Sequence, residues 1–206
     1  MAEIFQWPSD RRLPDEFLAR LKIMLDGGML IVYPTSTLYG LGASIRSVAG
    51  INFLNDVKAR PPGMPISIMA SAGQVRALCR IPESAGYFMD SRDQRITAVL
   101  PALEDAPGEL VHNGTLAVRL SCDELTASLV ESVGPITATS ANVHAASVPG
   151  DIPGAVEQLG DSVSVYIDSG TLAGKPTTLI DYTGPEPKII REGALSALEA
   201  EALHGR

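Results

Sequence analysis

The sequence contains little that would cross-link a protein through sulfur or metal. It has two cysteines, Cys79 and Cys122, and three histidines scattered along the chain. The spacing of these residues matches no zinc site and no dithiol redox motif. We therefore expect free, mostly buried thiols and no metal site built by the protein. Because free thiols are typical of a reducing compartment, we also expect a cytoplasmic location.

Long apolar runs and an excess of basic charge are also missing. Apolar stretches such as Met29–Tyr33 fall far short of the roughly 20 residues that a membrane-spanning helix needs. Glu3, Trp7 and Pro8 stand where a secretory signal would have a basic head and an apolar segment, so we expect no signal and no membrane partner. The 16 basic residues face 24 acidic ones, a formal net charge of −8. This balance argues against a protein that binds nucleic acid over its whole surface.

What the chain does contain suits a globular protein. Of its 206 residues, 45% are hydrophobic, and a chain of this length buries roughly 70% of its unfolded surface. Amphipathic patterns predict helices from Pro14 to Gly27, from Ser47 to Lys58 and from Ser71 to Cys79. A capping box formed by Ser121 and Glu124 predicts a fourth helix.

Between these helices the pattern predicts strands. They are expected at Met29–Tyr33, Pro65–Ala70, Ile96–Leu100, Leu116–Leu120, Pro135–Thr139, Val163–Asp168, Thr178–Asp181 and Lys188–Ile190. Because some connections are too short for helical crossovers, we expect mixed strand directions. The fold class predicted is therefore α/β, a single domain over residues 1–206 with mixed strand directions and flanking helices.

Two glycine-rich stretches resemble phosphate-binding motifs without completing them. Gly40-Leu-Gly42 follows a strand, but Ile45 occupies the place of the third glycine of a dinucleotide fingerprint. We interpret this stretch as a turn. The stretch from Gly170 to Lys175 is one residue short of a phosphate loop, and Pro176 lacks the hydroxyl that would bind magnesium. A plain turn is the better interpretation of Lys175.

Hydroxyl-rich strand ends that stand near lysine or arginine make up the remaining chemistry. They are Tyr33–Gly42, Lys58–Pro62, Thr137–Asn142, and Pro176–Thr178 with Arg191–Gly193. Together such groups can form a pocket for a polyanion. Taken one at a time, Lys58 and Arg60 also suit a helix C-terminus, and the hydroxyls suit ordinary strands and turns.

In order and spacing, these pieces resemble the YrdC-like family of L-threonylcarbamoyladenylate synthases from about Pro14 to Leu195. The matching motifs are Pro34–Gly42, Lys58–Pro61, Val118-Arg119, Thr139–Asn142, Thr177–Asp181 and Arg191–Gly193. The resemblance implies a twisted mixed sheet around a basic cavity, a domain core at about 14–195 and no additional C-terminal domain. It also implies the condensation of L-threonine, bicarbonate and ATP into threonylcarbamoyl-AMP and diphosphate. This product feeds the threonylcarbamoyladenosine modification of tRNA, so tRNA and tRNA-modifying proteins are candidate partners.

The resemblance also implies a role for each matching position. Lys58 and Arg60 would be catalytic and face the phosphates. The ATP-binding residues would be Lys58, Arg60, Thr115, Asn142 and Arg191. The threonine-binding residues would be Thr35, Ser67, Arg119, Ser140 and Thr177, with Arg119 paired to the carboxylate. Mg²⁺ would arrive with ATP, because charge on the phosphoryl oxygens and on the leaving diphosphate must be neutralised.

Several positions depart from the family pattern. Ser36 stands in place of an acidic residue, and Ser67 stands where many members have a threonine-contacting histidine. Val143-His-Ala-Ala replaces the Ser-Gly expected after Asn142, and Asp93–Thr97 replaces a proline-rich segment. These departures leave two alternatives, which are a non-catalytic nucleotide- or RNA-binding member and an enzyme that acts on another acyl-adenylate.

Overall fold

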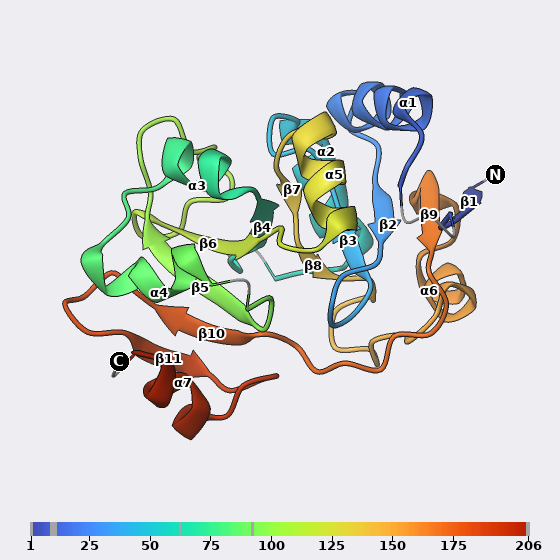
Figure 1. Cartoon of the computed structure of the whole chain (residues 1–206). Coiled ribbons are helices and arrows are strands. Elements are labelled where there is room, and N and C mark those ends of the chain that lie inside the picture. Colours follow the sequence, from blue (N-terminus) through green and yellow to red (C-terminus); the bar gives the residue numbers. More distant parts are fainter. Residues whose placement is uncertain (1, 9–11, 62, 92, 205–206) are drawn as a thin grey trace.

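A computed structural model describes residues 2–8, 12–61, 63–91 and 93–204 of the chain. Its strands form two mixed sheets (Figure 1). The first sheet has the spatial order β1 (Glu3–Gln6), β9 (Val165–Asp168), β2 (Ile31–Tyr33), β3 (Gly40–Gly42) and β8 (Thr139–Ser140). The second has the order β11 (Lys188–Arg191), β10 (Thr178–Asp181), β5 (Ile96–Pro101), β6 (Thr115–Leu120), β4 (Ser67–Ala70) and β7 (Ile136–Thr137).

Strand directions are mixed in both sheets. In the first sheet β9 runs parallel to β1 and β2, and β3 runs antiparallel to β2 and β8. In the second sheet the pairs β10–β5 and β6–β4 are parallel, and the remaining pairs are antiparallel. The predicted α/β class and mixed directions are confirmed, with the strands divided between two sheets.

Helices cover both sheets. They are α1 (Asp15–Asp26), α2 (Val48–Val57), α3 (Ala72–Leu78), α4 (Gly86–Asp90), α5 (Glu124–Val133), α6 (Ile152–Leu159) and α7 (Ala197–His204). Leu21 and Leu25 of α1 join Leu129 and Val133 of α5 in one core cluster against the first sheet. A larger cluster contains residues of both sheets, and so ties them together. None of the described helices has the length and hydrophobicity of a membrane span.

Short polar side chains start the helices as the sequence predicts, with one exception. Ser47 Oγ accepts from Gly50 N at 3.2 Å at the start of α2, and Ser71 forms a capping box with Gln74 at α3. The capping box predicted at Ser121 and Glu124 is wrong. Asp123 caps α5, because its Oδ1 accepts from Thr126 N at 2.9 Å and its Oδ2 accepts from Thr126 Oγ1 at 2.6 Å.

The stretch Gly40-Leu-Gly42 was predicted as a turn, and this prediction is wrong, since it forms β3. The ring of Tyr33 on β2 lies across both glycines. A Cβ atom at either position would come within 3.0 Å of that ring. The Tyr33 hydroxyl donates to Thr137 O at 3.0 Å, which fixes the buried ring where it is. The glycines therefore serve close packing between a ring and a strand, a role that the two-glycine pattern alone did not indicate.

The chain passes between the two sheets at two places that matter for the site. The crossing segment (Ile136–Ser140) leaves the second sheet as β7 and enters the first as β8, with Ala138 between them. The predicted single strand Pro135–Thr139 is therefore divided. The second passage is the strap (Ser169–Pro176), an irregular and mostly exposed segment that joins β9 to β10 (Figure 1, orange).

Hydrogen bonds hold the strap against the first sheet and its loops. The Tyr39 hydroxyl donates to Gly170 O at 2.6 Å. The backbone of Leu172 donates to Gly150 O at 2.7 Å, and that of Gly174 donates to Thr37 O at 3.1 Å. The strap is thus fixed along its length although it contains no helix or strand.

Candidate functional site

A cavity of about 520 Å³ lies where the crossing segment and the end of the strap approach the strands of both sheets. Six of the ten residues predicted for the site line this cavity. They are Arg60, Ser67, Arg119, Ser140, Thr177 and Arg191. The fold therefore gathers, at one place, side chains that are far apart in the sequence: from the segment after α2, from four strands and from the residue between the strap and β10.

The charged residues lining this cavity are of one sign. Three arginines line it, and no aspartate or glutamate is among the described residues that do. Arg60 Nη2 donates to Pro65 O at 2.8 Å, and Arg191 Nη2 donates to Thr177 O at 3.0 Å. Both contacts use backbone oxygens, which leave the positive charges without a carboxylate. Such guanidinium groups suit an anionic ligand.

Arg60 and Arg119 keep part of their hydrogen-bonding capacity unused. The buried Nε atom of each has no hydrogen-bond partner. Arg119 Nη2 donates to Thr37 Oγ1 and Arg60 Nη1 donates to Thr139 Oγ1, both at the long distance of 3.3 Å. Burial lowers the pKa of both guanidinium groups, yet an arginine stays charged at neutral pH.

Hydroxyl groups on the cavity are oriented by neighbouring polar atoms. Ser67 Oγ donates to Ala138 O at 2.6 Å, on the crossing segment. Thr177 Oγ1 lies 2.6 Å from Thr97 Oγ1, and either atom can donate. Ser140 Oγ donates to Asn142 Oδ1 at 2.5 Å. These hydroxyls are therefore held in fixed positions from which a polar ligand can be bound.

The side chain of Lys58 lies behind the cavity and is not among the residues that line it. Its buried Nζ atom donates to Ser140 O and Asn142 O, each at 2.5 Å, and to Asn142 Oδ1 at 3.2 Å. Burial, and secondarily the charge of Arg60, lowers the pKa of Lys58 to about 8. The structure thus directs the three N–H donors of this ammonium to the last residue of β8 and to Asn142 just beyond it, although the resemblance placed it on the phosphates.

The other three predicted residues also lie outside this cavity. Asn142 is buried and donates through Nδ2 to Ala146 O at 2.8 Å. Thr35 lines a neighbouring cavity of about 420 Å³ together with Trp7, and its Oγ1 lies 3.2 Å from that of Thr37. Thr115 begins β6 and donates through Oγ1 to His112 O at 2.7 Å. The structure does not bring the Thr115 side chain to the other site residues.

Three threonines and a histidine that were not predicted for the site also line this cavity: Thr37, Thr97, Thr139 and His144. Thr37 and Thr139 lie inside the motifs Pro34–Gly42 and Thr139–Asn142, so the motifs themselves were a usable signal. Thr97 is recognisable only through its contact with Thr177. His144 gave no signal, because its place depends on the path of the loop after Asn142.

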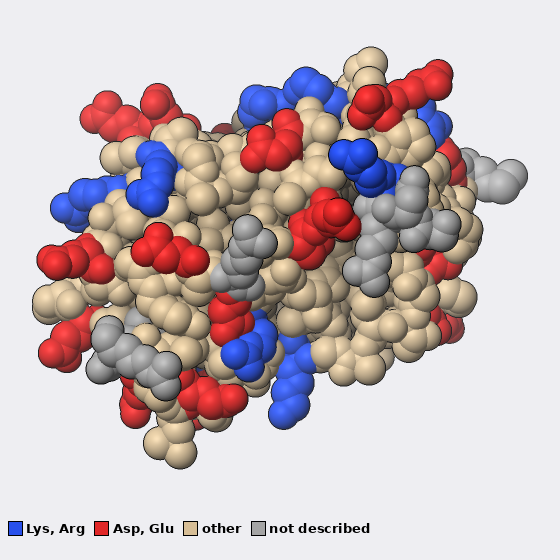
Figure 2. All heavy atoms as spheres, in the orientation of Figure 1, with Lys and Arg blue, Asp and Glu red and all other residues tan. Residues whose placement is uncertain are grey.

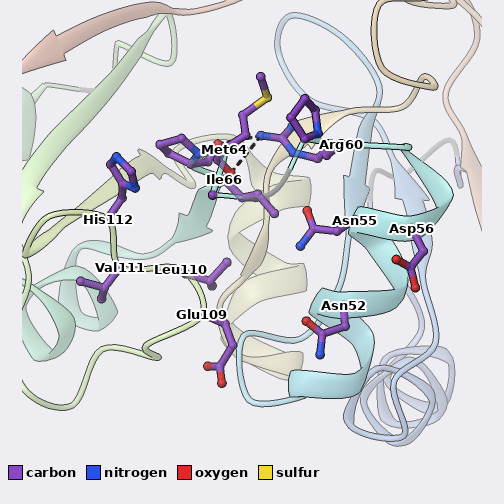
Figure 3. A pocket seen from close by; sticks show the side chains of 13 residues that line it. Asn52, Asn55, Asp56, Arg60, Met64, Ile66, Glu109, Leu110, Val111 and His112 are labelled. Atoms are coloured by element: carbon purple, nitrogen blue, oxygen red, sulfur yellow. Dashed lines mark hydrogen bonds between the residues drawn. The ribbon is translucent and has the colours of Figure 1, made fainter.

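A smaller cavity of about 340 Å³ shares Arg60 with the larger one (Figure 3). Helix α2 contributes Asn52, Asn55 and Asp56 to it, and Glu109 and His112 come from the loop before β6. Its two carboxylates make it less suited to a polyanion than the larger cavity. Among the described residues, no group of three or more His, Cys, Asp or Glu side chains is placed to hold a metal ion.

Fold and site define an α/β protein with a ligand-sized, arginine-lined cavity where its two mixed sheets meet. The chain belongs to the Sua5, YciO and YrdC family, whose model carries the description "Telomere recombination" and matches residues 23–193. A relative from Mycobacterium leprae, provisionally named a threonylcarbamoyl-AMP synthase, is 31% identical over 187 residues, which are 87% of this chain and 84% of the relative.

Two solved relatives share the fold. The threonylcarbamoyl-AMP synthase of Pyrococcus abyssi is 34% identical over 86% of this chain and 54% of its own length. A crystal structure of P. abyssi Sua5 complexed with L-threonine has a TM-score of 0.86, covering 98% of this chain and 60% of that one at 28% identity. This chain thus spans little more than half of the archaeal protein. Escherichia coli YciO, described as uncharacterized, is 27% identical over 84% of this chain and 86% of its own, with a TM-score of 0.83.

Proposed function

We propose that the protein is a threonylcarbamoyl-AMP synthase, a nucleotidyltransferase that condenses L-threonine, bicarbonate and ATP into threonylcarbamoyl-AMP and diphosphate. The observation that carries the proposal is the larger cavity, where three arginines and several oriented hydroxyls meet and no described lining residue carries a carboxylate. Such a lining suits the phosphates of ATP and the carboxylate of an amino acid. The proposal is also supported by family membership and by the relative complexed with L-threonine.

In the proposed reaction, the amine of threonine bonds to the carbon of bicarbonate to form a carbamate. A carbamate oxygen then attacks the α-phosphorus of ATP, and diphosphate leaves. Negative charge develops on the phosphoryl oxygens in this step, so fixed cations lower its barrier. We assign Arg60 and Arg191 to the phosphates. Mg²⁺ would enter bound to ATP, since the described residues that line the cavity offer it no carboxylate.

The threonine end of the cavity is assigned to Arg119 and the oriented hydroxyls. The fork of Arg119 matches a carboxylate geometrically, and its Nε is unused. Ser67, Ser140 and Thr177 carry the hydroxyls within reach. Lys58 would then act indirectly, by holding the backbone of Ser140 and Asn142 in place.

The test is diphosphate release from ATP, Mg²⁺ and bicarbonate, measured with and without L-threonine. We expect release that depends on threonine, together with a product that transfers the threonylcarbamoyl group. Release that ignores threonine would contradict the proposal. Tight nucleotide binding without turnover would favour a non-catalytic member of the family.

Substituting Arg60 with alanine tests the assignment of the phosphates. We expect kcat/KM for ATP to fall roughly 10-fold or more, because a charge-assisted hydrogen bond contributes about 1.5–3 kcal/mol. Exposed Arg76 on α3 offers a matched control as Arg76→Ala. Wild-type kinetics in Arg60→Ala would remove Arg60 from the site.

An autonomous RNA-binding function finds less support. Acidic and basic side chains are interspersed on the face in Figure 2, and no broad basic field covers it. The net charge of −8 also disfavours attraction of a phosphate backbone. We therefore expect any contact with tRNA to be weak without a partner protein.

A further inference from the structure

The proposed reaction needs a group that accepts a proton, because threonine enters as an ammonium and a protonated amine has no lone pair to attack carbon. When the N–C bond forms and the C–OH bond of bicarbonate breaks, nitrogen loses two protons. One leaves with the hydroxide as water, and the other must go to a base. The carbamate keeps the third proton on nitrogen and carries the negative charge that then attacks phosphorus.

Few groups on the larger cavity can take that proton. Its described lining contains no carboxylate, and its three guanidinium groups are already protonated. The Tyr39 hydroxyl donates to Gly170 O at 2.6 Å and accepts from Ser169 N at 3.0 Å, so it is engaged by the strap. The ammonium of Lys58 directs its three N–H donors to backbone and amide oxygens. His144 is the one imidazole among the described lining residues, and a neutral imidazole has a ring nitrogen that can accept a proton.

The loop that carries His144 is built to hold this residue at the cavity. His144 N donates to Lys58 O at 2.8 Å, while Lys58 Nζ holds Ser140 O and Asn142 O. One lysine thus binds the segment through both its backbone and its side chain. The loop is closed by Asn142 Nδ2, which donates to Ala146 O at 2.8 Å.

The backbone next to His144 is also constrained. Ala145 has a φ of 65°, in the left-handed region that costs a non-glycine residue free energy. Val143 N donates to Gln158 Oε1 at 3.1 Å, which ties the loop to α6. The side chain of His144 remains exposed while it lines the cavity. An imidazole placed in this way can pass a proton from the cavity to water.

We propose that His144 is the base that removes a proton from the ammonium of threonine, so that the free amine can bond to the carbon of bicarbonate. This inference rests on the proposed function and adds a catalytic residue to it. The charged and titratable groups that share the cavity with His144 are Arg60, Arg119, Arg191 and Tyr39, with Lys58 behind its loop.

The test compares His144→Gln and His144→Ala with the wild type in threonine-dependent diphosphate release between pH 6 and 10. We expect His144→Gln to be roughly 10²- to 10⁴-fold slower near neutral pH, the usual contribution of general base catalysis. We expect the KM for ATP to stay unchanged. The difference in rate between His144→Gln and the wild type should shrink toward pH 10, because threonine in solution then carries more of its free amine. Added imidazole should restore part of the rate of His144→Ala.

His112→Gln is the matched control, since His112 lines the smaller cavity and keeps its backbone contacts with Thr115. If diphosphate release by the wild type depends on threonine and His144→Gln keeps the wild-type rate, the role of His144 is overturned while the proposed function stands. A slower variant whose deficit is the same at every pH and unmoved by imidazole also overturns it, since that result indicates a structural role. Diphosphate release by the wild type without dependence on threonine overturns the proposed function, and the inference with it.

Discussion

At the scale of single residues, Arg119 occupies an unusual position for a charged side chain. It projects from β6, and its Nε atom is buried without a hydrogen-bond partner. Desolvation lowers its pKa, although nearby Asp123 acts in the opposite direction. Burying an arginine in this state destabilises the folded protein until an anion binds to it. We therefore expect its main contribution to be binding of the threonine carboxylate.

Replacing Arg119 tests this expectation. We expect Arg119→Ala to raise the KM for threonine roughly 10- to 100-fold, since a charge-assisted hydrogen bond contributes about 1.5–3 kcal/mol. Arg119→Lys should recover only part of the affinity, because an ammonium lacks the two-pronged geometry. Steady-state kinetics at saturating ATP measure both effects. An unchanged KM for threonine in both variants would place the carboxylate elsewhere.

The buried ammonium of Lys58 predicts a dependence of stability on pH. Its pKa is lowered to about 8 in the folded protein, from 10.5 ordinarily. The folded protein therefore binds this proton less tightly than the unfolded chain does. The cost of burying the charge is full below pH 8 and is relieved as pH rises toward 10.5.

Chemical unfolding of the wild type and of Lys58→Met at several pH values measures this effect. The difference in the free energy of unfolding between them should shift in favour of the wild type from pH 8 to pH 10. Titration of other groups, such as Cys79 with its pKa raised to about 11 by burial, cancels in the difference. If the free energies of unfolding of the wild type and Lys58→Met change in parallel from pH 8 to pH 10, Lys58 keeps an ordinary pKa.

Residue identities in the motifs were readable from the sequence, but their contacts were not. The motifs led to Arg60, Arg119 and Thr177, which do line the cavity. They also led to Lys58, whose ammonium is bound by Ser140 and Asn142 instead. A motif indicates that a side chain belongs to the region of the site. The direction in which it points depends on the loops around it.

At the scale of elements, the strap is the part that sequence reasoning described least well. Gly170 to Lys175 was interpreted as a plain turn, and the structure shows no helix or strand there. The strap matters because it contacts the loop before β3 and ends at the larger cavity. Gly174 lies against the backbone of Thr37, and the next residue, Lys175, leads to Pro176 and Thr177 on the cavity.

Gly174 therefore predicts a large effect from a small substitution. A Cβ atom there would lie 2.3 Å from Thr37 O and 2.8 Å from Thr37 Cα, so Gly174→Ala must push the strap away. We expect a loss of about 1–3 kcal/mol in the free energy of unfolding, the usual cost of overpacking, together with weaker threonine-dependent turnover. Thermal unfolding and the diphosphate assay measure the two effects.

Gly73→Ala provides the comparison. Nothing lies within 4 Å of a Cβ at Gly73, on α3, and alanine favours a helix over glycine by roughly 0.5–1 kcal/mol. The same substitution should therefore stabilise the protein at one site and destabilise it at the other. Equal melting temperatures for the wild type and Gly174→Ala would show that the strap can move away from Thr37 without loss of stability.

At the scale of the whole molecule, two sheets share one core. The larger cluster joins Val32 and Tyr166 of the first sheet to Ile68 and Leu116 of the second. Apolar burial that is common to both halves couples their stability. Neither sheet is therefore expected to unfold alone.

Denaturant titration tests this coupling with two signals. The single tryptophan, Trp7, packs against the smaller core on the first sheet, so its fluorescence reports that half. Far-ultraviolet circular dichroism reports both halves. We expect the two unfolding curves to coincide. A fluorescence transition that precedes the other would show that the first sheet opens independently.

The predicted strands at Ile96–Leu100, Leu116–Leu120 and Thr178–Asp181 correspond to β5, β6 and β10, because buried strands carry a clear apolar run. The sequence did not indicate that these strands belong to a second sheet. Nor did it reveal β1 or β3, in which short length or paired glycines hide the apolar signal. Partition into two sheets depends on which apolar faces meet, and one-dimensional periodicity contains no such information.

The position of β9 has a consequence for synthesis of the chain. β9 lies between β1 and β2 and pairs with both, although Glu3 and its partner Val165 are about 160 residues apart. Ribosomes add roughly 5–20 residues per second, so β1 and β2 are made about 10–30 s before the strand that separates them exists. During that interval each leaves an unpaired edge open to other nascent chains. We therefore expect the yield of soluble protein to depend on translation rate and on chaperones that cover such edges.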